Sequence, residues 1–246
     1  MTALPPAPPI RLGPAILLPD PSGALWWPDQ ATLIVADLHL EKGSSFARKG
    51  TLLPPYDTAA TLARLAILAE RYRPARIVAL GDSFHDAQAA DRLDPADQQQ
   101  LAALVEACDW IWIAGNHDPA PGPALGGTVL AEGSALAGLV LRHEALFEPD
   151  GPELSGHYHP KAGITVHGRR VSCRCFVADA RRIILPAFGT YTGGLSVRDP
   201  ALRRLFPTGF TAYLAGTKRV TAIPSLLLIG EIGNEQLPLG APAERC

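Results

Sequence analysis

Apolar residues fall into short runs along this chain, and in its first half these runs alternate with segments of helical periodicity. The runs Ala15–Leu18 and Ala24–Trp27 flank the turn sequence Asp20-Pro21-Ser22-Gly23, which predicts a hairpin. Thr32–Val35 is a continuous run of aliphatic and β-branched residues. Because both faces of such a run are apolar, it predicts a strand buried on both sides.

A helix is predicted over residues 58–72, directly after that strand. Asp57 stands where a helix cap belongs. The apolar stripe that would pack this helix against a sheet consists of Leu62, Leu65, Ile67 and Leu68.

The same alternation continues with a strand at Arg76–Leu80, a helix at Pro95–Ala107 and a strand at Trp110–Ala114. Strands that alternate with helices are typical of a mainly parallel sheet with helices on its faces. We therefore expect an α/β fold, with the four tryptophans in its core.

The second half reads differently, because after Gly127 the chain consists of short apolar runs separated by turns. Hairpin turns are expected at Gly168-Arg169 and Asp179-Ala180. These runs include Ile164–His167, Val171–Val177 and Ile183–Phe188. This half predicts a second sheet packed on the first, within a single domain that spans residues 1–246.

Composition limits the alternatives. The chain has 246 residues, of which 47% are hydrophobic, and a formal net charge of −2, so it can bury a core but lacks the strong positive charge of most DNA-binding modules. Its four cysteines form no C-x-x-C pair, so we expect reduced thiols and a cytoplasmic protein. We find neither a signal peptide nor an apolar run long enough for a membrane span.

Basic residues are concentrated in the last third of the chain. They are Lys161, Arg169, Arg170, Arg174, Arg181, Arg182, Arg198, Arg203 and Arg204. Such a cluster forms either an ordinary solvated face or a face that holds a polyanionic substrate, and the sequence leaves both interpretations open.

Residues that commonly bind metals follow the strands of the predicted sheet. Asp37-Leu38-His39 comes after the first, Gly81-Asp82 after the second and Gly115-Asn116-His117-Asp118 after the third. Later in the chain, His143 and Gly156-His157-Tyr158-His159 also follow short apolar runs. Because ligands of open α/β sheets gather beyond the carboxyl ends of the strands, we expect these loops to converge.

Spacing within the loops supports this convergence. Asp37 and His39 are two residues apart, so in an extended segment both side chains point the same way and Leu38 points into the core; His157 and His159 repeat the pattern. Six of the seven histidines lie in or beside these loops, which isolated structural histidines would not explain.

The ordered set D-x-H, G-D, G-N-H-D, a single histidine and G-H-x-H resembles the motif series of the calcineurin-like metallophosphoesterase superfamily. The resemblance implies an α/β (α+β in some schemes) four-layer sandwich, two packed mixed β-sheets flanked by helices. It places the motif core at about 32–194 and leaves 195–246 as an unassigned C-terminal extension of the same domain.

The resemblance also implies a centre of two divalent metal ions, and the oxygen and nitrogen donors favour Mn²⁺ over Fe, Zn²⁺ or Mg²⁺. Asp82 would bridge the ions, and the two ions would acidify a bridging water. One ion would be held by Asp37, His39, Asp82 and His159, and the other by Asp82, Asn116, His143 and His157.

Three further roles follow from the resemblance. His117 would protonate or stabilise the departing oxygen, and Asp118 would orient its ring. His85 would contact substrate or form the pocket wall.

Within the superfamily, the stretch from Asp37 to Gly50, together with Gly81–Asp86 and Ser155–Pro160, resembles the bacterial ligase-associated DNA damage response endonucleases. This implies a phosphodiesterase acting on DNA, with DNA ligase and helicase partners. Lys42, Arg48 and Lys49 would then either reach the substrate phosphate or remain solvated. The aromatics of Pro186–Gly194 would stack a base or pack a strand end.

Other functions remain open at this stage. The same metal pair would serve a phosphatase or pyrophosphatase, because the residues that line the pocket determine which ester is hydrolysed. No cap or long insertion is evident between the motifs, which favours a bulky or polymeric diester. A non-catalytic protein-binding scaffold is disfavoured because every motif residue is intact.

Overall fold

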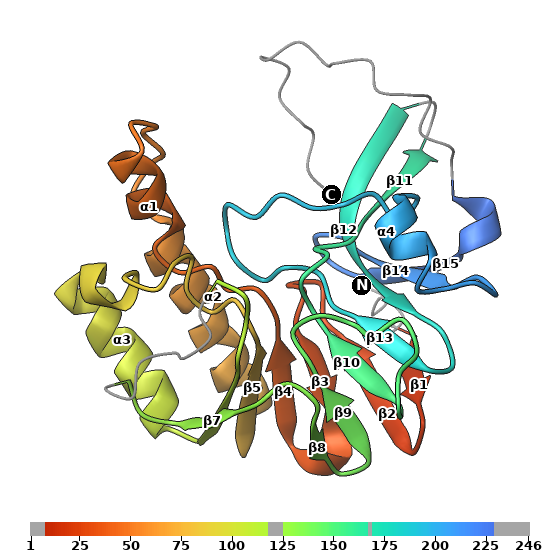
Figure 1. Cartoon of the computed structure of the whole chain (residues 1–246), viewed down its shortest axis with the longest axis horizontal. Coiled ribbons are helices and arrows are strands. Elements are labelled where there is room, and N and C mark those ends of the chain that lie inside the picture. Colours follow the sequence, from red (N-terminus) through yellow and green to blue (C-terminus); the bar gives the residue numbers. More distant parts are fainter. Residues whose placement is uncertain (1–7, 118–124, 167–168, 229–246) are drawn as a thin grey trace, which may run out of the picture.

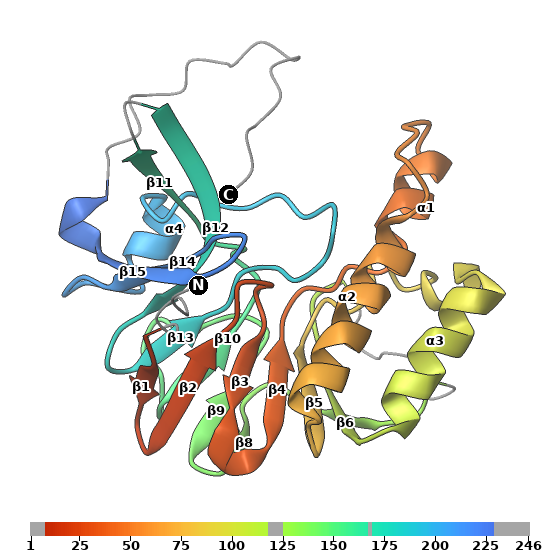
Figure 2. The ribbon, with the colours of Figure 1, turned by 180° about the vertical axis from the view of Figure 1, so that it is seen from behind.

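The computed structural model describes residues 8–117, 125–166 and 169–228. Its body consists of two β-sheets that face each other, with helices on the outer face of the first (Figures 1 and 2). Two packed mixed sheets are what the motif resemblance implies, although few helices flank them.

The first sheet has seven strands, and their order in space follows their order in the chain. Strands β4 to β7 are parallel, whereas β1 to β3 pair in antiparallel fashion, which includes the predicted hairpin of β2 and β3. The strands are β1 (Ile10–Leu12), β2 (Ala15–Pro19), β3 (Leu25–Trp27), β4 (Thr32–Val35), β5 (Arg76–Leu80), β6 (Asp109–Ile113) and β7 (Thr128–Leu130).

The second sheet has the order β15-β14-β12-β13-β10-β9-β8, and β11 pairs with the long strand β12. Its strands are β8 (Ser134–Leu136), β9 (Leu139–Leu141), β10 (Glu153–Ser155), β11 (Lys161–Val166), β12 (Arg169–Ala178), β13 (Arg182–Ile184), β14 (Thr211–Ala215) and β15 (Val220–Pro224). The last two strands lie in the segment that the sequence left unassigned, and they complete this sheet.

Alternation along the strands divides the core into layers. In β4, Leu33 and Val35 face the helices, whereas Ile34 faces the second sheet. Trp110 and Trp112 of β6 likewise face the helices and are buried. A third cluster covers the outer face of the second sheet, under α4 (Pro200–Arg203). The side-chain period of two therefore gives each sheet two apolar faces.

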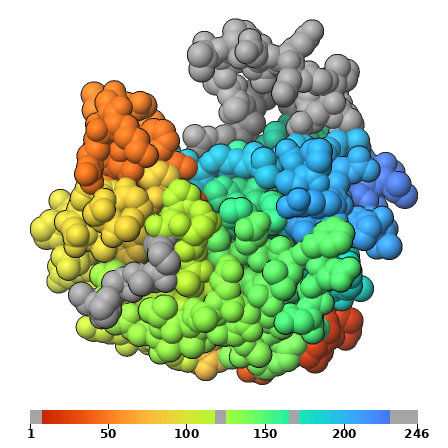
Figure 3. All heavy atoms as spheres, viewed as in Figure 1, coloured from red at the N-terminus to blue at the C-terminus, as the bar shows by residue number. Residues whose placement is uncertain are grey.

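The helices that cover the first sheet are α2 (Asp57–Tyr72) and α3 (Pro95–Glu106), while α1 (Lys42–Arg48) stands out from the body (Figures 1 and 3). Two details of the α2 prediction are wrong. Asp57 does not cap the helix, because its carboxylate accepts a hydrogen bond from the backbone N–H of Gly43. Ile67 is 57% exposed, since it lies beside the buried stripe rather than in it.

Short 3₁₀ turns connect several elements, namely η1 (Pro28–Gln30), η2 (Ala90–Arg92) and η4 (Ser225–Leu227). The turn predicted at Asp179 joins β12 to β13, and its carboxylate accepts hydrogen bonds from the N–H groups of Arg181 and Arg182. Part of the other predicted turn, at Gly168-Arg169, lies outside the described residues. Among the helices that the structure describes, none is long and apolar enough to cross a membrane.

Two cysteines fit the expectation of reduced thiols, since Cys108 and Cys175 are both free.

Candidate metal centre

The candidate site lies at the carboxyl ends of five strands that belong to the two sheets. The loops after β4, β5 and β6 of the first sheet meet those after β9 and β10 of the second. In chain order they carry Asp37, His39, Asp82, Asn116, His117, His143, His157 and His159. The convergence expected from the sequence is thus present, and it occurs at the joint edge of two sheets.

One group of donors consists of Asp37, His39 and His159, whose possible ligand atoms all lie within 4.8 Å of one another. Nε2 of His159 is 3.3 Å from both Oδ1 of Asp37 and Nε2 of His39. Asp37 and His39 are buried, and His159 is half-buried. Two ring nitrogens directed at one point beside a carboxylate are an arrangement that suits a cation.

A second group consists of Asp82, His143 and His157, again with ligand atoms within 4.8 Å. Nε2 of His143 lies 3.0 Å from Nδ1 of His157 and 2.7 Å from Oδ1 of Asn116. The amide oxygen of Asn116 therefore lies beside this group. Nδ1 of His143 faces the carbonyl of Leu80 at 3.2 Å and donates to it, which leaves Nε2 directed at the other donors.

Asp82 lies between the two groups. Its Oδ2 is 3.4 Å from Nε2 of His143 in one group and 3.8 Å from Nε2 of His39 in the other. Its Oδ1 accepts a hydrogen bond of 2.9 Å from the backbone N–H of His117, which fixes the carboxylate plane. One buried carboxylate thus faces both candidate cation positions.

The backbone at these residues is unusual. Five of the predicted ligands have a left-handed φ, namely Asp37 (54°), His39 (44°), Asp82 (45°), His157 (68°) and His159 (47°). The side chains of Asp37 and His39 therefore converge through left-handed turns, not through the extended segment that the two-residue spacing suggested. Leu38 and Tyr158 are nonetheless buried, as expected. Strained backbone of this kind clusters at functional sites.

Two glycines make the close approach of the loops possible. A Cβ added to Gly81 would lie 2.4 Å from Nδ1 of His143, and one added to Gly156 would lie 2.5 Å from Oδ2 of Asp37. Any larger residue would displace a candidate ligand. The glycines of the G-D and G-H-x-H motifs are thus explained by space around the donors.

Electrostatics differ among the donors. Burial alone would lower the pKa of His143, but its hydrogen bond to Asp82 and the charges of Asp82 and Asp37 raise that pKa to about 9. Burial alone would raise the pKa of Asp82, but His143 lowers it to about 2. Burial, together with the charge of His159, lowers the pKa of His39 to about 2. In the absence of metal the site thus holds one cationic imidazole next to neutral ones.

His117 lies at the open side of the centre, with 42% of its side chain exposed. Its Nδ1–H donates to the carbonyl of His85 at 2.9 Å, so its Nε2 lies toward Asp82, 3.9 Å from Oδ2. The rings of His85 and His117 are stacked, with centroids 5.3 Å apart. Asp118, which the sequence assigned to orient this ring, lies outside the described residues; the ring is held by His85.

His85 also lies beside the first group, with its Nδ1 3.5 Å from Nδ1 of His39. Burial and the nearby charges of Lys42 and His117 lower its pKa to about 4, so it is neutral. Lys42 is half-buried, and its ammonium group lies 5.9 Å from the ring of Phe46. Arg48 is exposed at the end of α1, and the structure describes no side-chain contact between it and the site.

Two acidic residues at the site were not found from the sequence. Oε1 of Glu132 accepts hydrogen bonds from the backbone N–H groups of His143 and Glu144. Oε1 of Glu144 lies 3.9 Å from Nε2 of His157 and accepts a hydrogen bond from Tyr158. Neither belongs to a recurring motif; only the position of Glu144 next to His143 would have indicated it.

The aromatic residues of Pro186–Gly194 contact other segments of the chain. Phe188 is fully buried and stacks against the guanidinium of Arg64 at 4.5 Å, and the hydroxyl of Tyr191 donates to the carbonyl of Pro54. The interpretation in which this segment packs a strand end is the correct one for Phe188.

The donors as a set suit hard or borderline divalent cations. They comprise carboxylate oxygens, one amide oxygen and imidazole nitrogens, and no thiolate among the described residues joins them. Two groups that share a central carboxylate match a pair of ions about 3.5–4 Å apart.

Comparison with known proteins agrees with this geometry. The family model described as calcineurin-like phosphoesterase matches residues 31–185. The crystal structure of Pseudomonas putida nuclease MPE is 30% identical, with a TM-score of 0.69, and the match covers 88% of this chain and 100% of that one. The E. coli phosphoesterase Yfce is 12% identical, with a TM-score of 0.40, over 78% and 97% of the two chains. No curated protein matches the chain.

Proposed function

We propose that this chain, which belongs to the calcineurin-like phosphoesterase family and is a metal-dependent phosphoesterase, hydrolyses phosphodiester bonds in DNA. The observation that carries the proposal is the position of Asp82, whose single carboxylate faces both groups of donors. The two groups, taken with the family fold, support two divalent metal ions.

The ligand assignment is part of the proposal. Asp37, His39 and His159 would hold one ion, Asn116, His143 and His157 would hold the other, and Asp82 would be a ligand of both. We propose Mn²⁺ as the metal, since a mixture of imidazole and carboxylate donors suits it well. When bound, the two ions stabilise negative charge on the attacking and leaving oxygens of an in-line displacement.

His117 supplies the proton to the departing oxygen. Its Nδ1–H is engaged by the carbonyl of His85, so Nε2 is the atom directed toward the reaction centre. Stacking on the neutral ring of His85 keeps the imidazole in this orientation. Lys42, on the adjacent helix, adds positive charge near the site and helps to hold the substrate phosphate, with Arg48 further out.

A polynucleotide substrate is supported by the protein of known structure that is 30% identical over 88% of this chain and is named as a nuclease, and the motif resemblance narrows the proposal to DNA. A role in DNA repair with DNA ligase and helicase partners, in the cytoplasm, extends the proposal from the motif resemblance. Co-purification of the tagged chain with a ligase or helicase from cells would support these partners, and its absence at endogenous expression would weigh against them.

The activity is tested with two chromogenic esters. Purified protein is stripped with EDTA, reloaded with Mn²⁺, Mg²⁺ or Zn²⁺, and assayed on bis-p-nitrophenyl phosphate and p-nitrophenyl phosphate. The proposal expects metal-dependent cleavage that favours the diester and is lost in Asp82→Ala. Asp91→Ala, at an exposed carboxylate of η2, is the matched control.

The outcomes separate the alternatives. Diester cleavage followed by scission of a DNA strand supports the proposal. A preference for the monoester favours a phosphatase, and preference for pyrophosphate favours a pyrophosphatase. Full metal loading without hydrolysis of any ester would indicate a protein-binding scaffold.

A further inference from the structure

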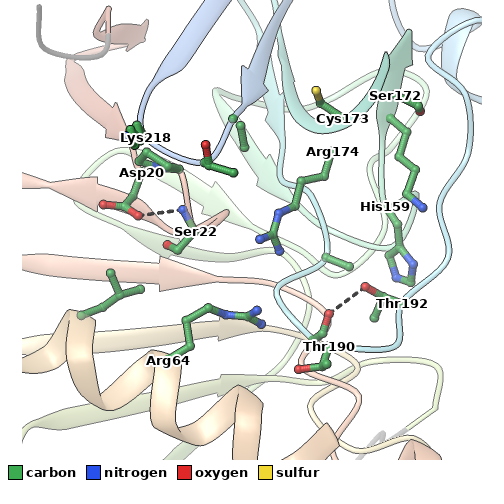
Figure 4. Close-up of a pocket in the computed structure, with 18 of the residues that line it drawn as sticks. Asp20, Ser22, Arg64, His159, Ser172, Cys173, Arg174, Thr190, Thr192 and Lys218 are labelled. Atoms are coloured by element: carbon green, nitrogen blue, oxygen red, sulfur yellow. Dashed lines mark hydrogen bonds between the residues drawn. The ribbon is translucent and has the colours of Figure 1, made fainter. Parts of the chain in front are cut away.

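A pocket of about 770 Å³ opens beside His159, between α2 and the second sheet. In Figure 4, His159 stands toward one end of the pocket, and Asp20 and Lys218 stand toward the other. The guanidinium groups of Arg64 and Arg174 point toward each other from opposite walls (Figure 4). Because Nε2 of His159 lies 3.3 Å from Asp37, the pocket is continuous with the candidate metal centre.

The lining of this pocket is strongly basic. Among the described residues that line it, Asp20 is the only acidic one, and its carboxylate already accepts hydrogen bonds from Arg71 and from the hydroxyl of Tyr72. The basic lining residues are Arg64, Arg71, Lys161, Arg174 and Lys218. A concave surface with this excess of positive charge concentrates anions.

Arg64 is held ready for a ligand. Its guanidinium stacks on the ring of Phe188 and donates to the carbonyl of that residue. It forms no ion pair with a described carboxylate, and its buried Nε has no hydrogen-bond partner. Burial and the charge of Arg174 lower its pKa to about 10, so it remains a cation at neutral pH. Two guanidinium groups that face each other are stabilised when an anion lies between them.

The lining also indicates what part of a ligand is recognised. It includes the hydroxyl residues Ser22, Ser172, Thr190, Thr192 and Thr217, and the described residues that line it include no Phe, Tyr or Trp on which a base would stack. Contacts of this type position a nucleic-acid backbone without reading its sequence.

We propose that this pocket binds the phosphates of the polynucleotide strand next to the scissile diester, with Arg64 and Arg174 as the central contacts and Lys161 and Lys218 at its margins. The inference rests on the proposed function and specifies how the substrate is held. It makes the enzyme tolerant of base sequence, and it makes a polymer a better substrate than a small diester.

The test compares a fluorescent single-stranded DNA oligonucleotide with bis-p-nitrophenyl phosphate. Arg64→Gln removes a central contact, and the double variant Lys161→Gln/Lys218→Gln removes two peripheral ones without disturbing the stacking on Phe188. Arg11→Gln, at an exposed position of β1 outside the pocket, is the control. Circular dichroism and Mn²⁺ content establish that each variant is folded and loaded.

We expect kcat/KM on the oligonucleotide to fall roughly tenfold more than kcat/KM on the small diester, because a charge-assisted contact to phosphate is lost. The salt dependence of oligonucleotide binding, measured by fluorescence anisotropy, should become shallower by about one phosphate contact per charge removed. Arg11→Gln should match the wild type in both measurements.

Two failures can be told apart. If the wild type cleaves the small diester but no polynucleotide, the proposed function fails and this inference fails with it. If the wild type cleaves the oligonucleotide, but the pocket variants lower both activities equally or leave the salt dependence unchanged, only the pocket assignment is overturned.

Discussion

Replacing Gly81 with alanine tests whether the loops of the site are packed so closely that one methyl group displaces a ligand. Gly81 has a φ of 73°, and its added Cβ would lie 2.4 Å from Nδ1 of His143. The left-handed backbone alone costs about 1–2 kcal/mol for a residue with a Cβ. Moving the imidazole also breaks its hydrogen bonds to Leu80 and Asn116, at about 1 kcal/mol each.

These contributions predict a loss of about 3–4 kcal/mol in the free energy of unfolding, or roughly 6–16 °C in Tm for a chain of this size. Mn²⁺ affinity should fall roughly 10–100-fold, since a ligand has lost its orientation. Thermal unfolding of the metal-free protein and calorimetric Mn²⁺ titration measure both quantities.

Gly50→Ala is the matched control, because Gly50 has a φ of 82° but no atom lies within 4 Å of a Cβ added there. This variant should show the backbone strain alone, about 1–2 kcal/mol, and bind Mn²⁺ normally. Equal destabilisation of the two variants, with unchanged Mn²⁺ affinity in Gly81→Ala, would refute the reasoning.

Three further outcomes are expected. Asp82→Ala should lose both metal and activity, whereas His117→Ala should keep its metal and show a turnover lower by about 100-fold or more. Metal analysis and single-turnover kinetics measure the two effects separately. Equal metal loss in both variants would contradict the different roles of Asp82 and His117. The pKa of His143 without metal is about 9, so below that pH a cation must displace the proton of the imidazole. The affinity for Mn²⁺ should therefore rise from pH 6 toward pH 9. Calorimetric titrations that give the same affinity across this range would disprove the prediction. Arg182→Met should destabilise the fold by about 1–3 kcal/mol in denaturant unfolding, since the buried carboxylate of Glu153 loses its 3.7 Å partner and keeps Arg142 at 3.2 Å, and Glu153→Leu in the same chain should restore part of the loss.

The site could be predicted from the sequence because its donors are short-range signals placed after strands. A parallel sheet converts such positions into neighbours, so residues as distant as Asp37 and Asn116 were placed together correctly. The strands could also be predicted from local sequence, because a continuous apolar run such as Thr32–Val35 requires both faces of the strand to be buried.

What the sequence did not predict depends on contacts between distant segments. Asp57 satisfies the N–H of Gly43 instead of capping its own helix, and no local pattern distinguishes the two uses. The basic residues of the last third likewise have different surroundings in the fold, since Arg174 lines the pocket whereas Arg182 is fully buried beside Glu153. Arg64 belongs to the first half of the chain, and only the folded structure brings it into the same pocket.

The left-handed backbone at the donor residues has a consequence for how this protein tolerates change. Each such residue costs about 1–2 kcal/mol relative to glycine, less for Asp than for His. The backbone of the candidate metal centre therefore lowers the stability of the fold in order to hold the donor side chains in place. Random substitution followed by selection for heat resistance alone should accumulate glycine or asparagine at His39, His157 and His159, and the more stable proteins so obtained would be catalytically silent.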